Sequence, residues 1–267
     1  ILSGSQISFS SANDMATFAG DVTGATIFGG GGADTLKFSG NVTVGFGDAI
    51  ASASQISFAA GNDMATFNSA VGAASIFGGS GADTLRFGGA VSGATIDAGA
   101  DSNVLVFSST AAANISSAGA LTATFGGGAT VNFGSQILSG SQISFSSAND
   151  MATFSGAVSA AMIFGGSGAD TLRFGGAVSG ATIDAGADSN VLVFSSTAAA
   201  NISSAGALTA TFGGGATVNF GSQILSGSQI SFSSANDMAT FAGDVTGATI
   251  FGGGGADTLK FSGNVTV

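Results

Sequence analysis

The sequence lacks the residues on which most enzyme chemistry depends. It has no histidine, cysteine, tyrosine, tryptophan or proline, and its 15 acidic residues are all aspartate. The usual general acids, bases and nucleophiles are therefore reduced to aspartate, serine, threonine and four cations, which are Lys37, Arg86, Arg173 and Lys260. This inventory disfavours catalysis, and we expect that the protein is not an enzyme.

Positive charge is also scarce. The formal net charge is −11, which disfavours nucleic acid and anionic membrane surfaces as partners, because both need Lys and Arg to face phosphates. Small cations are the natural counterparts of such a chain. The absence of cysteine excludes disulfides and suits an extracellular or cell-surface location. No apolar run approaches the roughly 18 residues of a membrane-spanning helix, so none is predicted.

What the chain does have is repetition. Residues 1–44 recur letter for letter at 224–267, and the segment Phe77–Phe154 recurs as Phe164–Phe241. Such self-similarity indicates a stack of copies. We expect one continuous domain over 1–267, with repeat units at 1–49 (a short copy), 50–136, 137–223 and 224–267 (a truncated copy). The pattern runs through both ends, which predicts a segment of a longer repetitive protein.

A shorter period lies inside each copy. Ile7–Phe18 aligns with Ile27–Phe38 at an offset of 20, and the matching phenylalanines recur in steps of 18, 20 or 29 residues. Each interval holds two short β-like segments separated by Gly, Ser, Asn and Asp, and the 46 glycines disfavour helix. We therefore predict an all-β, parallel β-solenoid of the β-roll type. It should have about 12 coils of 18–20 residues, with periodic coils of 29 residues.

The alternation within each segment predicts an inner and an outer face. In Thr35–Phe38, Leu36 and Phe38 should point inward and Lys37 outward. Stacked coils then form a packed core, which we favour over a ligand groove. One predicted column of this core contains Phe18, Phe38, Phe67, Phe87, Phe107 and Phe125. The other contains Ile7, Ile27, Ile56, Ile76, Ile96 and Ile115. The roughly nine extra residues of each 29-residue coil are expected to form an additional strand, a hairpin flap or a lateral contact.

Two kinds of side chain are expected on the outer face. The four cations would either prevent indiscriminate strand pairing or join neighbouring filaments by meeting Asp. Met15, Met64, Met151 and Met238 would leave an apolar surface that favours lateral packing.

Aspartates recur in the turns, and the 20-residue offset places them beside one another in pairs. At a separation of about 5 Å, two carboxylates repel by about 3 kcal/mol for an effective dielectric near 20, unless a cation intervenes or one carboxyl takes a proton. Calcium prefers oxygen ligands. The candidate metal ligands are Asp14 with Asp34, Asp63 with Asp83, Asp150 with Asp170, and Asp237 with Asp257.

Four segments fit the nonapeptide GGxGxDxUx, namely Gly29–Lys37, Gly78–Arg86, Gly165–Arg173 and Gly252–Lys260. In these segments the chain resembles the repeats-in-toxin family, whose parallel β-rolls bind calcium between successive turns. The resemblance implies ligands from the backbone carbonyls of the glycine turns and from Asp34, Asp83, Asp170 and Asp257.

The good copies alternate with turns such as Ser10–Asp14, and a third coil places Asn103 in the aspartate column. Without metal, glycine would supply positive-φ turns and Asp would cap backbone N–H groups, so both interpretations stay open. A phosphate-binding loop would need a following Gly-Lys-Ser/Thr, which is missing.

These features predict a structural protein. The first hypothesis is a self-associating segment of a longer extracellular fibre, surface layer or adhesin, which stacks head to tail or packs laterally with its own copies. The second is a calcium-binding β-roll module of a secreted protein whose folding is driven by calcium. A third is an ice-binding solenoid, whose outward threonines Thr17, Thr66 and Thr124 would be interrupted by Lys37 and Arg86.

Overall fold

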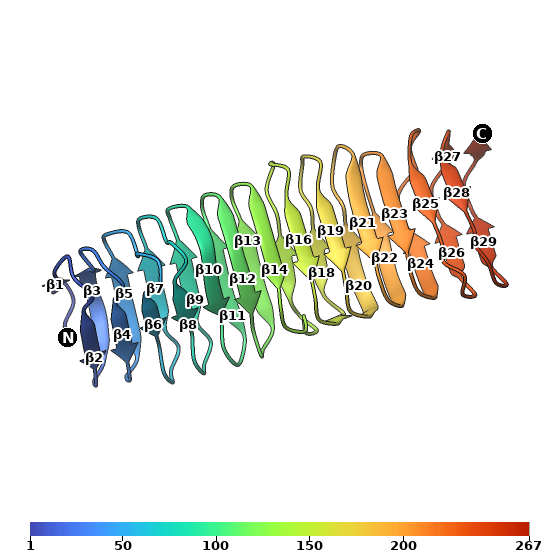
Figure 1. Ribbon diagram of the computed structural model, residues 1–267. Coiled ribbons are helices and arrows are strands. Elements are labelled where there is room, and N and C mark those ends of the chain that lie inside the picture. Colours follow the sequence, from blue (N-terminus) through green and yellow to red (C-terminus); the bar gives the residue numbers. More distant parts are fainter. Residues whose placement is uncertain (267) are drawn as a thin grey trace. The chain divides into compact units, whose positions relative to one another are not determined.

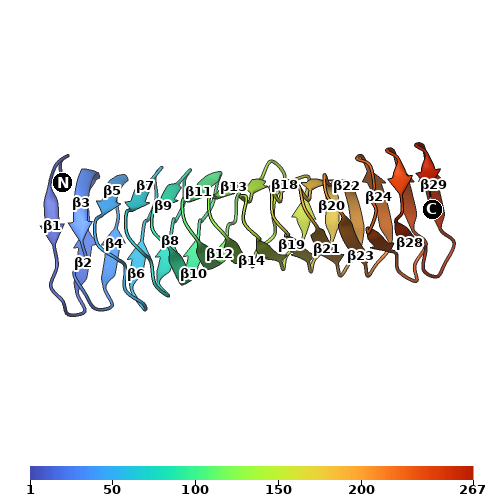
Figure 2. The ribbon, with the colours of Figure 1, turned by 90° about the horizontal axis from the view of Figure 1, so that it is seen from above.

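A computed structural model describes residues 1–266, and its regular elements are all β-strands. No helix able to cross a membrane is found in this part of the chain. The chain divides into two compact units, Ile1–Val131 and Asn132–Val267. Within each unit, successive strands of three or more residues alternate between two parallel sheets, so that two such strands and two turns complete one coil (Figures 1 and 2). The predicted all-β parallel β-solenoid is confirmed, with about 13 coils.

Unit 1 contains two parallel sheets, which we call A and B. In spatial order, sheet A contains β1 (Gln6–Ser8), β3 (Val22–Phe28), β5 (Val42–Phe46), β7 (Met64–Phe67), β9 (Thr84–Phe87), β11 (Asn103–Phe107) and β13 (Leu121–Phe125). Sheet B contains β2 (Met15–Phe18), β4 (Thr35–Phe38), β6 (Gln55–Ser57), β8 (Ser75–Phe77), β10 (Val91–Asp97) and β12 (Ala111–Ser116). Strand β14 (Ala129–Phe133) includes the division between the units.

Unit 2 contains sheets C and D. Sheet C contains β15 (Gln142–Ser144), β18 (Met162–Phe164), β20 (Val178–Asp184), β22 (Ala198–Ser203), β24 (Ala216–Phe220), β26 (Met238–Phe241) and β29 (Thr258–Phe261), with β17 (Val158–Ser159) also paired to β20. Sheet D contains β16 (Met151–Phe154), β19 (Thr171–Phe174), β21 (Asn190–Phe194), β23 (Leu208–Phe212), β25 (Gln229–Ser231) and β28 (Thr249–Phe251). Strands β27 (Val245–Thr246) and β30 (Val265–Thr266) form a separate pair.

Stacked phenylalanine rings fill the interior of each unit. In sheet A the ring centroids of Phe67, Phe87 and Phe107 follow one another at 4.9 and 4.7 Å, and the rings are within 7° of parallel. In sheet D, Phe154, Phe174 and the following rings repeat this spacing. These side chains are fully buried, whereas Lys37 is exposed, as the alternation predicts. The aromatic core is therefore confirmed.

The 29-residue steps are not long coils but one and a half ordinary coils. Phe38 does not stack on Phe67; it stacks on Phe58 at 5.2 Å in sheet B and meets the edge of Phe46 at 6.5 Å. Phe67 instead stacks on Phe46 at 4.8 Å in sheet A. In unit 2, Phe212 and Phe220 are likewise edge-on at 6.4 Å. Each predicted column of Phe and Ile therefore breaks at the step and continues in the opposite sheet.

The extra residues of each 29-residue step form one strand and one turn. Strand β5 supplies the additional half coil in unit 1, so Leu36 pairs with Ile56 and Val44 pairs with Ala65. Strand β24 does the same in unit 2. Of the three predicted forms of the extra segment, the additional strand is correct. Nine residues suffice for a short strand and a turn, and both sheets accept the same inward side chains.

Candidate metal centre in the aspartate turns

The glycine turns bring the backbones of successive coils into close contact. Before β9, Gly79 and Gly81 have φ values of +94° and +113°, a region that favours glycine. A Cβ atom at Gly79 would collide with the carbonyl oxygen of Ala59 in the preceding coil. The motif therefore uses glycine because carbonyl oxygens of the neighbouring turn occupy the space of a side chain.

The predicted aspartate pairs are neighbours in the structure. In each pair the backbone N–H of the earlier aspartate donates to Oδ1 of the later one, for example from Asp63 to Asp83 at 2.9 Å. The other pairs have the same bond, at 3.0 Å for Asp14 to Asp34, 2.8 Å for Asp150 to Asp170 and 3.0 Å for Asp237 to Asp257. We call each such series of bonds an Asp ladder. The carboxylate thus caps the coil before it.

The ladders extend beyond the predicted aspartates. The N–H of Val42 donates to Asp63 Oδ1 at 2.7 Å, and the N–H of Asp83 donates to Asn103 Oδ1 at 2.9 Å. In unit 2, the N–H of Asp170 donates to Asn190 Oδ1 at 2.9 Å. Another ladder continues from Asp34 to the hydroxyl of Ser54 at 3.1 Å. The 20-residue offset is the signal that identifies Ser54, Asn103 and Asn190.

The turns are of two kinds, which differ in whether the second carboxylate oxygen, Oδ2, accepts a hydrogen bond. Asp14 Oδ2 accepts hydrogen bonds from the N–H and the hydroxyl of Ser10, both at 2.9 Å, and Asp237 is held in the same way by Ser233. The Oδ2 atoms of Asp63, Asp83 and Asp170 are buried and accept no hydrogen bond. The position occupied by Ser10 is Ala59, Gly79 or Gly166 in these turns, so no hydroxyl reaches the carboxylate.

Burial without a donor makes these carboxyls hard to ionise. Burial raises the pKa of Asp83 to about 6; the N–H of Asp63 opposes this shift, and the charges of Asp63 and Asp101 add to it. Burial likewise raises the pKa of Asp170 to about 6. Burial also raises the pKa of Asp63, and the N–H of Val42 opposes this shift only in part. Each turn therefore favours either a proton or a neutralising cation.

Two further aspartates, which are not among the predicted ligands, adjoin these turns. Asp101 Oδ2 accepts the N–H of Gly81 at 3.1 Å, and Asp188 Oδ2 accepts the N–H of Gly168 at 3.0 Å. Both have a positive φ, near +64° and +62°. They brace the glycine turn from the next coil and add negative charge beside Asp83 and Asp170.

The ligands available in these turns suit calcium. Within residues 1–266, no three acidic side chains gather into one cluster, so a metal ion would be held by one or two carboxylates and by backbone carbonyl oxygens. The buried Oδ2 atoms without a donor are the observation that favours such an ion. The eight aspartates stay predicted ligands, and Asp63, Asp83 and Asp170 have the clearest need for a cation.

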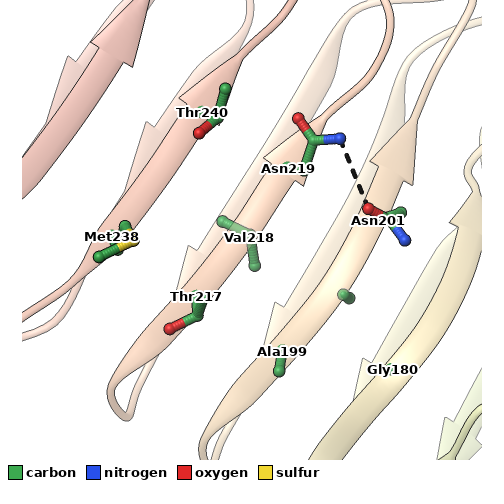
Figure 3. A pocket seen from close by; sticks show the side chains of 9 residues that line it. Gly180, Ala199, Asn201, Thr217, Val218, Asn219, Met238 and Thr240 are labelled. Carbon is green, nitrogen blue, oxygen red and sulfur yellow. Dashed lines mark hydrogen bonds between the residues drawn. The ribbon is translucent and has the colours of Figure 1, made fainter.

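The outer face of sheet C carries a shallow depression that is lined by no acidic side chain. It has a volume of about 310 Å³ and lies over β20, β22, β24 and β26 (Figure 3). Thr217, Met238 and Thr240 line it, and Asn219 Nδ2 donates to Asn201 Oδ1 at 3.5 Å. None of its lining residues is an acid or a base, so it offers no groups for proton transfer.

One known repeat family matches the chain at its glycine turns. The RTX calcium-binding nonapeptide repeat matches four segments, at residues 26–38, 72–90, 162–177 and 249–261. No curated protein matches the chain. A solved hyperactive, Ca²⁺-dependent, β-helical antifreeze protein from an Antarctic bacterium is similar at 17% identity and a TM-score of 0.33, covering 96% of this chain and 80% of that one. The repeats indicate Ca²⁺ binding, and the chain is an RTX-like β-roll repeat protein.

Proposed function

We propose that the chain is a structural, non-enzymatic segment of an extracellular repetitive protein that binds Ca²⁺ in its turns and associates with further copies of itself. The observation that supports this most is the recurrence of one turn: all four aspartate pairs share the same N–H to Oδ1 bond. A catalytic centre needs one cluster of different groups, whereas equal sites spread along a repeat suit a scaffold.

The residues that would hold Ca²⁺ are the aspartates of the ladders together with the carbonyl oxygens of the glycine turns. Bound calcium would supply positive charge between stacked carboxylates. The chain itself supplies the rest of the site: the N–H groups of Asp63 and Asp150 fix one oxygen of Asp83 and Asp170, and burial keeps water away from the other. The turn therefore holds its carboxylate in place before any ion arrives.

Self-association is supported by apolar side chains on the outer faces. Met15 is 81% exposed, and Met64, Met151 and Met238 are also exposed. In the neighbouring strands these methionines pair with threonine, since Met15 pairs with Thr35 and Met64 with Thr43 and Thr84. Exposed apolar positions that repeat with the sequence suit contact with an identical surface.

Electron microscopy and circular dichroism of the same sample, first in Ca²⁺ and then in excess chelator, test the proposal. We expect filaments in Ca²⁺ and a β-sheet spectrum whose thermal midpoint falls on chelation. A chain that stays monomeric at high concentration in Ca²⁺ would contradict self-association. If chelation abolishes the β-sheet spectrum altogether, calcium drives folding and the protein is a calcium-dependent folding module instead.

A further inference from the structure

Asn103 and Asn190 differ from the aspartates of the same ladders in one atom, and that atom changes what the turn needs. Asp83 Oδ1 accepts the N–H of Asp63 at 2.9 Å, and Asn103 Oδ1 accepts the N–H of Asp83 at 2.9 Å. The two side chains therefore occupy equivalent places, one coil apart. Only the second terminal atom is different, an oxygen in Asp83 and a nitrogen in Asn103.

The amide nitrogen of Asn103 binds the carbonyl oxygens of its own turn. It lies 2.9 Å from the oxygen of Ala100, 3.3 Å from that of Gly99 and 3.5 Å from that of Asp101. Asn190 repeats this arrangement in unit 2, with the oxygen of Ala187 at 2.8 Å. The orientation of the amide is fixed, because reversing it would set a donor against the N–H of Asp83 and an acceptor against three carbonyls.

The turn of Asp83 has the same backbone form but no donor. Gly79 and Gly99 have φ values of +94° and +89°, and φ is positive at both Gly81 and Asp101. In the turn of Asp83, one coil before Asn103, the atom equivalent to that amide nitrogen is Oδ2, which is buried and has no hydrogen bond. A buried carboxylate oxygen without a donor requires a cation or a proton beside it.

We propose that Asn103 and Asn190 replace the calcium ion in their turns. Their amide nitrogens satisfy the carbonyl oxygens that an ion would coordinate, so each ladder ends in a turn that closes without metal. Within these two ladders, the need for calcium is then confined to the aspartate turns that precede the asparagine. This inference rests on the proposed binding of Ca²⁺, and it adds that this chain limits its own number of sites.

Two opposite substitutions in the full chain test the inference, with calcium titration calorimetry and thermal unfolding in chelator as readouts. Asp83→Asn should bind fewer Ca²⁺ ions than the wild type and should unfold a few degrees higher in chelator, because the new amide satisfies the turn. Asn103→Asp should bind more Ca²⁺ and unfold lower in chelator. Asp48→Asn is the matched control, since it removes the same charge outside the ladders and should change neither readout.

The outcomes separate this inference from the proposed function. If Asp83→Asn unfolds at or below the wild-type midpoint in chelator, or if Asn103→Asp gains no Ca²⁺ while the wild type binds it, the amide does not replace the ion. A wild-type chain that binds no Ca²⁺ would contradict the proposed function. In that case the chelator midpoints of wild type and Asp83→Asn still decide whether an amide closes the turn.

Discussion

Replacing Phe87 with alanine removes one ring from the middle of the aromatic column of unit 1. Phe87 is fully buried and stacks on Phe67 at 4.9 Å and on Phe107 at 4.7 Å. Truncating a buried phenylalanine to alanine costs about 3–5 kcal/mol, and each lost stacking contact contributes roughly 0.5–1.5 kcal/mol beyond area burial. We expect Phe87→Ala to lower the free energy of unfolding by about 4–6 kcal/mol.

Urea denaturation followed by circular dichroism, in saturating Ca²⁺, measures this loss. Phe77→Ala is the matched control, since Phe77 is 38% exposed and precedes Phe87 by half a coil. Its substitution should cost less than about 1 kcal/mol. Equal losses for the two variants would refute the reasoning, because the stacked column would then contribute no more to stability than an exposed ring. Hydrogen exchange should rise mainly in β7, β9 and β11, since a stacked repeat transmits damage to its neighbours.

Three further results are expected. In calcium-free protein, the pKa of Asp83 and of Asp170 is raised to about 6, so the folded state takes up protons at a higher pH than the unfolded state does. Urea titrations should therefore show that the free energy of unfolding rises as pH falls from about 7.5 to about 5. A decrease over this range would contradict the pKa shifts. In denaturant titrations, Gly79→Ala should lower the free energy of unfolding by more than about 1 kcal/mol. Gly20→Ala has open space at its Cβ and should change it by less than about 0.5 kcal/mol. Similar values for the two variants would refute the steric argument. Calcium at about 1,000 times its dissociation constant should stabilise the chain by about 4 kcal/mol for each site, so an unchanged thermal midpoint on chelation would exclude specific binding.

Much of the fold follows from the 20-residue offset. It predicts the coil, the inward position of Phe18 and Phe38, the outward position of Lys37 and the contact between Asp14 and Asp34, and the structure confirms each of these. The prediction succeeds because strand pairing in a solenoid is parallel and in register, so that identical residues lie beside one another.

The same offset fails at the 29-residue steps for a physical reason. Phe38 and Phe67 each end a four-residue strand with the same alternation of inward and outward side chains, but they belong to opposite sheets. Both sheets bury the same types of side chain, so the sequence period does not distinguish them. The role of Asn103 was hidden for another reason: its position in the column is visible in the sequence, whereas the carbonyl oxygens that meet its amide depend on backbone angles in the turn.

The half coil also decides the direction in which each copy of the nonapeptide faces. In unit 1 the turn of Asp34 connects sheet A to sheet B, whereas the turn of Asp83 connects sheet B to sheet A, so the two turns lie on opposite edges. In unit 2 the turns of Asp170 and Asp257 are opposed in the same way. A partner that recognised the nonapeptide turn would therefore find one copy of it on each of two opposite edges of a unit. Repetition interrupted by a half coil would allow cross-links in two directions, where uninterrupted repetition would allow avidity on one side only.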